Sequence, residues 1–223
     1  MKLASRPTIL FLALQSAGAF APRTAGGAAT AVSRFHSASA SASASASSVT
    51  TDSSSVCSRI ENDSLYSTLN EQITNELAAS QLYLSASLWC ERRNLIGMAA
   101  YMRAESDEER SHALSFVDFA NKRQMPVQLQ SLAAPPSDWD SVVDLWQALL
   151  TAEKENTLAL QKLDQVADEY KDTALSTFLD SFHLEQVESE NSLRNILAKA
   201  RDMEETPGLL RQLDTELGDQ ASS

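Results

Sequence analysis

One segment of this sequence has an apolar stripe at helical spacing with ionisable residues in its middle. Between residues 95 and 123 large apolar side chains recur at helical spacing, and Glu105, Glu109 and His112 occupy the same stripe. Burying unpaired charge costs many kcal/mol, so a helix that turns this face to a core needs a neutralising partner. Glu109 and His112 stand one turn apart on one face, the Glu-x-x-His spacing of carboxylate-bridged dimetal sites in helix bundles. The stripe therefore predicts a buried metal site. The alternative is that these groups face solvent.

Composition favours helices and narrows the kinds of partner. The 223 residues include only six Gly and six Pro, which favours helix over sheet. Residues 1–51 carry a charge of +4 and no acid, so with −12 overall residues 52–223 carry −16. Excess negative charge argues against nucleic acid and anionic membrane surfaces, and suits a protein that attracts cations. Only two cysteines occur, Cys57 and Cys90, which excludes a disulfide framework and a Cys-rich zinc site.

The first 51 residues predict targeting signals. Residues 1–19 have a basic start, an apolar run too short to span a bilayer and an A-x-A cleavage pattern, as in a signal peptide. Residues 20–51 are rich in Ser and Ala, and we expect this transit-like segment to be disordered. Together the two segments resemble the bipartite presequence of algae with secondary plastids, which predicts a plastid (chloroplast) protein. Secretion is the alternative. Residues 52–223 then form the mature domain, in which no segment is apolar enough to span a membrane.

Hydrophobic periodicity predicts four long helices and a short fifth one. Their approximate ranges are 64–93, 95–123, 140–168, 173–202 and 206–217. Residues 124–139 cannot be one helix because they contain Pro126, Pro135 and Pro136. This segment is long for a bundle connection but suits an extended chain that crosses the length of a bundle. The prediction is an all-α fold of two helical hairpins joined by one long crossover.

Each long helix carries a polar residue in its apolar seam. The four positions are Glu76, Glu109 with His112, Glu153 and Gln186. Glu76 and Glu109 are 33 residues apart, as are Glu153 and Gln186, so two hairpins with equal arms would bring all four to one level. Where a second Glu-x-x-His would stand, the sequence has Gln186-x-x-Ser189, so the two metal positions should differ. We expect Glu76, Glu109 and His112 to hold one metal. Glu109 as a bridge, Glu153 and Gln186 would hold the weaker one.

This ligand set suits iron. Carboxylates with one imidazole fit Fe(II), which keeps open coordination positions for dioxygen. Zinc sites usually have more His or Cys ligands. The ligand set does not exclude manganese. Tyr83, two turns after Glu76, is expected to donate a hydrogen bond to a ligating carboxylate or to lose an electron during oxidation. A plain core tyrosine is the alternative. Glu105 and Glu190 are expected to form a third iron position that is more accessible to solvent. For both, a solvated carboxylate is the alternative.

Residues 62–217 resemble the non-haem ferritins, especially the algal and bacterial-type ones. The matching segments are 75–77 with Tyr83, 98–102, 104–112, 119–123, Glu153, 183–187 and 206–211. The resemblance implies a ferritin-like four-helix bundle with a short C-terminal fifth helix. It makes Glu76, Glu109, His112, Glu153 and Gln186 the ferroxidase centre, and it matches Glu105 and Glu190 to an extra iron site.

The same resemblance implies an activity and an assembly. Fe(II) would be oxidised with dioxygen and stored as a ferric mineral in a homo-oligomeric shell of about 24 subunits. A haem-binding member would have Met after the bridging Glu, where this chain has Arg110, so no haem is predicted.

Three alternatives are weaker. Another dimetal oxidase on the same scaffold would keep both Glu-x-x-His halves. An iron-buffering or structural subunit without turnover would be expected to have lost Glu109 or His112. A DNA-protecting mini-ferritin would lack the fifth helix.

Overall fold

Helices make up most of the chain that the structure describes. In this computed structural model the described residues are 64–203 and 206–222, so the predicted signal peptide, the transit-like segment and residues 52–63 lie outside them. The helices are α2 (Ser64–Arg92), α3 (Ile96–Lys122), α4 (Val142–Tyr170), α5 (Thr173–Met203) and α6 (Pro207–Gln220). The described residues form no strand, and none of their helices is long and apolar enough to cross a membrane. The all-α prediction is confirmed, with helix ends shifted by at most three residues.

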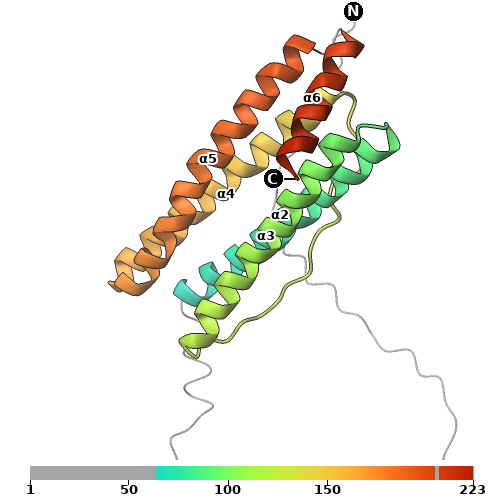
Figure 1. Cartoon of the computed structure of the whole chain (residues 1–223). Coiled ribbons are helices and arrows are strands. Elements are labelled where there is room, and N and C mark those ends of the chain that lie inside the picture. Colours follow the sequence, from blue (N-terminus) through green and yellow to red (C-terminus); the bar gives the residue numbers. More distant parts are fainter. Residues whose placement is uncertain (1–63, 204–205, 223) are drawn as a thin grey trace, which may run out of the picture. The chain divides into compact units, whose positions relative to one another are not determined.

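The long helices form two hairpins that pack on each other. α2 packs against α3, α4 packs against α5, and α2 also contacts α4 (Figure 1). Both hairpin turns are tight because a residue in the left-handed conformation ends the first helix of each pair, Asn94 at φ 57° and Lys171 at φ 55°. The following amide closes the turn on the helix, with Leu95 N and Asp172 N each donating to a carbonyl five residues earlier.

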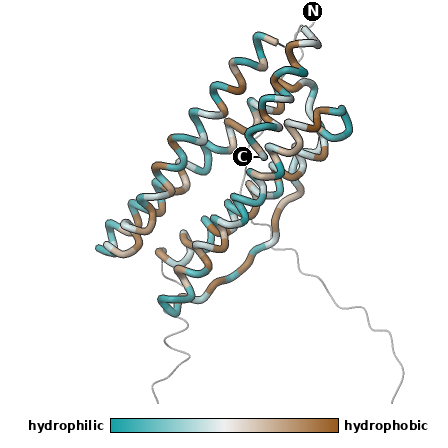
Figure 2. The backbone as a smooth tube through the Cα atoms, in the orientation of Figure 1, coloured by the Kyte–Doolittle hydropathy of each residue, from teal (hydrophilic) through white to brown (hydrophobic). Residues whose placement is uncertain are grey.

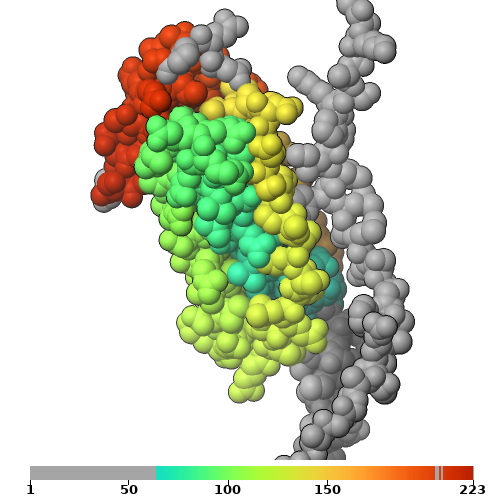
Figure 3. Space-filling model, turned by 90° about the vertical axis from the view of Figure 1, so that its right-hand side faces the viewer, coloured from blue at the N-terminus to red at the C-terminus, as the bar shows by residue number. Residues whose placement is uncertain are grey.

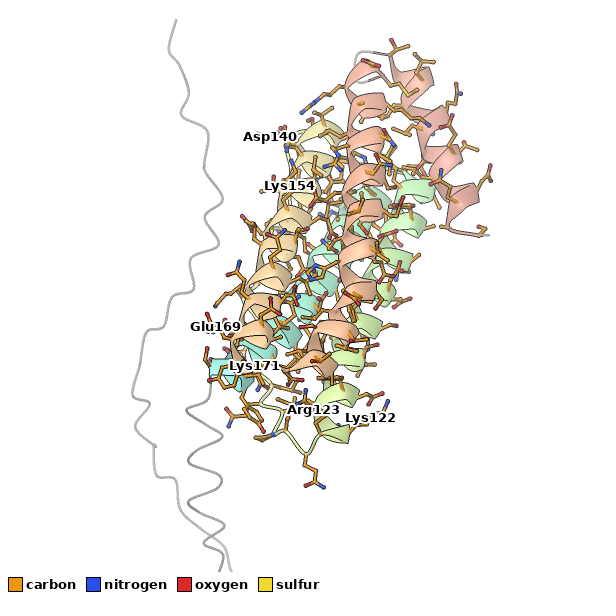
Figure 4. The ribbon with its side chains drawn as sticks, turned by 90° about the vertical axis from the view of Figure 1, so that its left-hand side faces the viewer. Lys122, Arg123, Asp140, Lys154, Glu169 and Lys171 are labelled. Atoms are coloured by element: carbon orange, nitrogen blue, oxygen red, sulfur yellow. The ribbon has the colours of Figure 1, made fainter. Side chains whose placement is uncertain are left out.

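One extended segment joins the two hairpins. In Figure 4, Arg123 at the end of α3 and Asp140 just before α4 lie at opposite ends of the bundle. A helix of 27 residues such as α3 is about 40 Å long, so the connection has to run that distance. Residues 124–141 do so without helical structure, as the three prolines predict.

The crossover lies against α2 and is bonded to it along its length. Figure 3 shows it, coloured from yellow-green to yellow, beside the blue-green surface of α2. Near its start, Gln128 N donates to Asn70 Oδ1 at 2.7 Å, and near its end Ser85 Oγ donates to Pro136 O at 2.6 Å. These bonds satisfy polar groups of a segment that has no helical hydrogen bonds of its own.

The bundle core consists of two apolar clusters separated by a polar layer. Apolar and polar residues alternate along every helix in Figure 2. The cluster nearer α6 contains Trp89, Met102 and Trp146, and the cluster at the other end contains Leu69, Phe116 and Leu163. Along each of α2, α3, α4 and α5, buried polar residues lie between the stretches that enter the two clusters. They include the four buried seam positions that the sequence singled out, Glu76, Glu109, Glu153 and Gln186.

Helix α6 is held against the start of α3 by a close backbone approach (Figure 1). A Cβ atom on Gly97 would lie 1.7 Å from the carbonyl oxygen of Asp214, so only glycine fits there. The Asp214 carboxylate accepts a hydrogen bond of 2.8 Å from Met98 N, in the first turn of α3. The residue before α3, Leu95, offers no capping side chain, so α6 supplies the cap of α3.

Candidate metal centre

The polar layer brings one side chain or more from each long helix to one level. α2 contributes Glu76, α3 contributes Glu109 and His112, α4 contributes Glu153 and α5 contributes Gln186. All are buried except His112, whose side chain is 19% exposed. Each stands in a regular helix, so its position follows from helical spacing rather than from loop geometry.

Three of these residues converge closely enough to share a cation. Glu76, Glu109 and His112 each offer a ligand atom within 4.8 Å of the other two. Glu109 Oε2 lies 3.5 Å from His112 Nδ1, and it is buried without a hydrogen-bond partner among the described residues. A buried carboxylate oxygen with no donor is rare in folded proteins, and a metal ion would satisfy it. The donor set, two carboxylates and one imidazole, fits iron.

The electrostatics of the layer also favour a cation. Burial, and then the charge of Glu153, raises the pKa of Glu109 to about 8. Burial, and then the neighbouring Glu109, raises the pKa of Glu76 well above its usual value. None of the ion pairs in the described chain joins a lysine or arginine to Glu76, Glu109 or Glu153. Protein charges therefore leave the negative charge of this layer uncompensated.

Glu153 belongs to a second group of contacts. Tyr83 donates from its hydroxyl to Glu153 Oε1 at 2.5 Å, and Gln186 Nε2 donates to Glu153 Oε2 at 3.0 Å. Burial and the adjacent Glu153 raise the pKa of Tyr83, so its hydroxyl keeps the proton that it donates. Among the described residues, Glu153 is not part of a group of three acids or histidines whose ligand atoms all lie within 4.8 Å of one another. The surroundings of Glu153 therefore differ from those of Glu76 and Glu109, because Gln186 Nε2 donates to Glu153.

The two residues predicted for a third iron position have different surroundings. Glu105 is half-buried, and burial followed by the charge of Glu108 raises its pKa to about 7. Glu190 is held by other partners, since Thr157 Oγ1 and Arg194 each donate to one of its oxygens at 2.8 Å. The structure does not place Glu105 and Glu190 in one close group of acids and histidines.

A different group lies on the outer side of His112. Glu108, His112 and Glu185 each offer a ligand atom within 4.8 Å of the other two, and His112 Nε2 is 3.5 Å from Glu185 Oε2. Glu108 is exposed, and the side chain of Glu185 is 43% exposed. His112 thus has one ring nitrogen facing the buried carboxylates and the other facing a partly exposed one.

Sequence reasoning missed three residues that contact the centre. Gln72 and Asn156 are buried and bonded to Glu76, and Glu185 faces His112. A signal for the first two was present, because Gln72 is one turn before Glu76 and Asn156 is one turn after Glu153.

The comparisons with known proteins agree with this geometry. The profile of the ferritin-like domain matches residues 66–203. The chain belongs to the ferritin family. It is 31% identical over 140 residues to a bacterial non-heme ferritin of Bacteroides fragilis, covering 63% of this chain and 88% of that protein. With a bacterial non-heme ferritin of Campylobacter jejuni it shares 32% identity over 133 residues, 60% of this chain and 80% of that protein.

Solved ferritin structures match more closely in sequence. The apo-ferritin of Pseudo-nitzschia multiseries is 50% identical, with a TM-score of 0.66 over 68% of this chain and 96% of that one. The crystal structure of a PmFTN variant soaked in iron has the same sequence identity and TM-score, and the match covers 67% of this chain and 97% of that one. The ferritin-like fold predicted for this chain is thereby confirmed, and family and neighbours support iron binding and iron storage.

Proposed function

We propose that this ferritin is a ferroxidase that oxidises Fe(II) with dioxygen at a dimetal centre within one subunit. The observation that carries the proposal is Glu109 Oε2, a buried carboxylate oxygen without a donor in the described part of the chain. It lies 3.5 Å from His112 Nδ1, and Glu76 is close enough to share a cation with both residues. The ferric product would be stored inside an oligomeric shell.

Two Fe(II) ions are the substrate, and the residues divide between them. Glu76, Glu109 and His112 bind the first ion. Glu109, Glu153 and Gln186 bind the second, and a bridging Glu109 keeps the two ions close together. The open positions that one imidazole and carboxylates leave on Fe(II) admit dioxygen.

Proton release accompanies binding. Burial raises the pKa values of the Glu76 and Glu109 carboxyl groups, which favours their protonated forms before iron arrives. Because metal ligands must be deprotonated, iron binding releases these protons. Two Fe(II) ions then give two electrons to one dioxygen, and two protons complete its reduction to hydrogen peroxide.

Stopped-flow absorbance tests the centre. Anaerobic Fe(II)-loaded protein is mixed with oxygenated buffer, beside Glu109→Ala and the control Glu169→Ala, an exposed acid near the end of α4 (Figure 4). We expect a fast rise in ferric absorbance in the parent and in the control, and a loss of about 100-fold or more in Glu109→Ala. A rate that Glu109→Ala leaves unchanged would refute the centre. Tight iron binding without oxidation in the parent would favour an iron-buffering subunit instead.

A third iron position is part of the proposal. Glu105 borders the centre and is its first candidate ligand. Glu190 is a weaker candidate, because both its oxygens already accept hydrogen bonds. Glu105→Ala should lower the number of Fe(II) bound per subunit in anaerobic calorimetry without abolishing the fast phase. Loss of the fast phase itself would place Glu105 in the dimetal centre.

The assembly and the cellular site are proposed from the resemblance. We expect a homo-oligomeric shell of about 24 subunits, which sedimentation velocity can measure. For residues 1–51 we propose delivery to the plastid. A fluorescent protein carrying these residues should enter plastids, and one carrying residues 1–19 alone should enter the secretory pathway. Secretion of the longer fusion would contradict the plastid assignment.

A further inference from the structure

Two buried amide side chains contact Glu76 and each other. Gln72 Nε2 on α2 donates to Glu76 Oε1 at 2.6 Å and to Asn156 Oδ1 at 2.7 Å. Asn156 Nδ2 on α4 donates to Glu76 Oε2 at 3.4 Å. Gln72 and Glu76 are each 1% exposed and Asn156 is 7% exposed. Both oxygens of Glu76 therefore accept a hydrogen bond from a neutral donor, and the pair joins helices of different hairpins.

We propose that Gln72 and Asn156 are positioning residues of the iron centre, which hold Glu76 in the orientation that binds the first Fe(II). The inference rests on the proposed function. A glutamate that is free to change rotamer has to be ordered when the metal binds, and this cost weakens binding. The two amides order Glu76 before iron arrives, so less of the binding free energy is lost.

Neutral donors suit this task better than charged ones. A lysine or arginine at position 72 would also bond to Glu76, but its charge would compensate the carboxylate that attracts the cation. A glutamate there would add a further negative group to a buried layer. An amide donates hydrogen bonds without a net charge. The orientation of Glu76 is fixed while the charge of the layer stays available to iron.

The same arrangement recurs at Glu153. Its two oxygens accept hydrogen bonds from Tyr83 and Gln186, which are also uncharged donors. Glu109 Oε2, by contrast, has no donor among the residues that the structure describes. Each carboxylate proposed to bind a single metal is thus held at both oxygens. The carboxylate proposed to bridge two metals keeps a free oxygen.

The substitution Gln72→Met tests the inference, because methionine has a similar length and no hydrogen-bond donor. Co(II) serves as the probe in anaerobic titrations of the assembled protein, followed by its visible absorption. We expect the dissociation constant of the first Co(II) to rise about 10- to 100-fold, as for other residues that orient metal ligands. The Fe(II) concentration for half-maximal oxidation should rise by a similar factor, while the rate at saturating Fe(II) changes little.

A double-mutant cycle separates positioning from a general loss of structure. In a Glu76→Ala background Gln72→Met should have no further effect on Co(II) binding, because the carboxylate that it holds is gone. Asn156→Leu should act in the same direction with a smaller loss, since its contact with Glu76 is longer. The matched control is Asn70→Leu. This amide on α2 is also buried, but it bonds to the crossover, so its loss should leave Co(II) affinity unchanged.

The outcomes discriminate between the two proposals. If Gln72→Met weakens Co(II) binding equally with and without Glu76, or leaves it unchanged in both, the positioning role is wrong. If Glu76→Ala alone leaves the affinity for the first Co(II) unchanged, the ligand set of the proposed function fails instead.

Discussion

Replacing Glu109 by glutamine should stabilise the metal-free protein at neutral pH. The pKa of Glu109 is raised by burial and by Glu153 to about 8, against 4.5 for an ordinary glutamate. Below pH 4.5 Glu109 is protonated in both the folded and the unfolded chain, so its ionisation costs the folded state no stability. As the pH rises from 4.5 towards 8 the unfolded chain ionises first, so stability is lost across this window. At 1.36 kcal/mol per pH unit, the interval from 4.5 to 7 corresponds to about 3 kcal/mol.

Glutamine has the shape of the protonated acid and does not ionise. Glu109→Gln should therefore recover about 3 kcal/mol at pH 7, and less than about 1 kcal/mol at pH 5. For a chain of this size the gain at pH 7 corresponds to a rise in Tm of roughly 6–12 °C. The same substitution removes an anionic ligand, so it should weaken Fe(II) binding while it stabilises the empty protein.

Thermal unfolding of chelator-treated protein, followed by circular dichroism at pH 5 and pH 7, measures the effect. Glu169→Gln is the matched control, since Glu169 is exposed and its replacement should leave Tm unchanged at both pH values. The reasoning is refuted if Glu109→Gln does not raise Tm at pH 7, or if the gain at pH 5 equals the gain at pH 7. Adding Fe(II) anaerobically should raise the Tm of the parent more than that of the variant.

Three further substitutions test other parts of the structure. Gly97→Ala places a Cβ atom 1.7 Å from the carbonyl oxygen of Asp214, so α6 should detach from α3 and become sensitive to limited proteolysis; unchanged protection would contradict the close approach. Arg123→Ala breaks the 2.6 Å ion pair with Asp172, whose side chain is 9% exposed, and should lower the free energy of unfolding in urea by about 1–3 kcal/mol. Ser189→His introduces a second imidazole one turn after Gln186 and should strengthen binding of a second Co(II) about tenfold. An unchanged Co(II) absorption spectrum would show that a side chain at position 189 does not reach the metal.

Local sequence patterns were sufficient to predict the helices, the crossover and the polar positions of the core. Helical periodicity is local, so the spacing of Met98, Met102 and Phe116 was enough to show which face of α3 is buried. Three prolines excluded helix in the connection, because proline breaks a helix whatever its tertiary surroundings. Equal separations of Glu76 from Glu109 and of Glu153 from Gln186 then predicted a common level, which agrees with the polar layer between the two apolar clusters.

The hydrogen-bond partners of these polar groups, by contrast, could not be predicted from local patterns. Spacing along a helix shows which residues share a face, but hydrogen bonds depend on the rotation and axial shift of one helix relative to its neighbours, at a scale of tenths of an ångström. The contact of Asn156 with Glu76 and the contact of Thr157 with Glu190 both cross between helices, so no pattern within one helix could reveal them. For the same reason, only the three-dimensional positions of the neighbouring donors show that Glu109 Oε2 lacks a hydrogen-bond partner among the described residues.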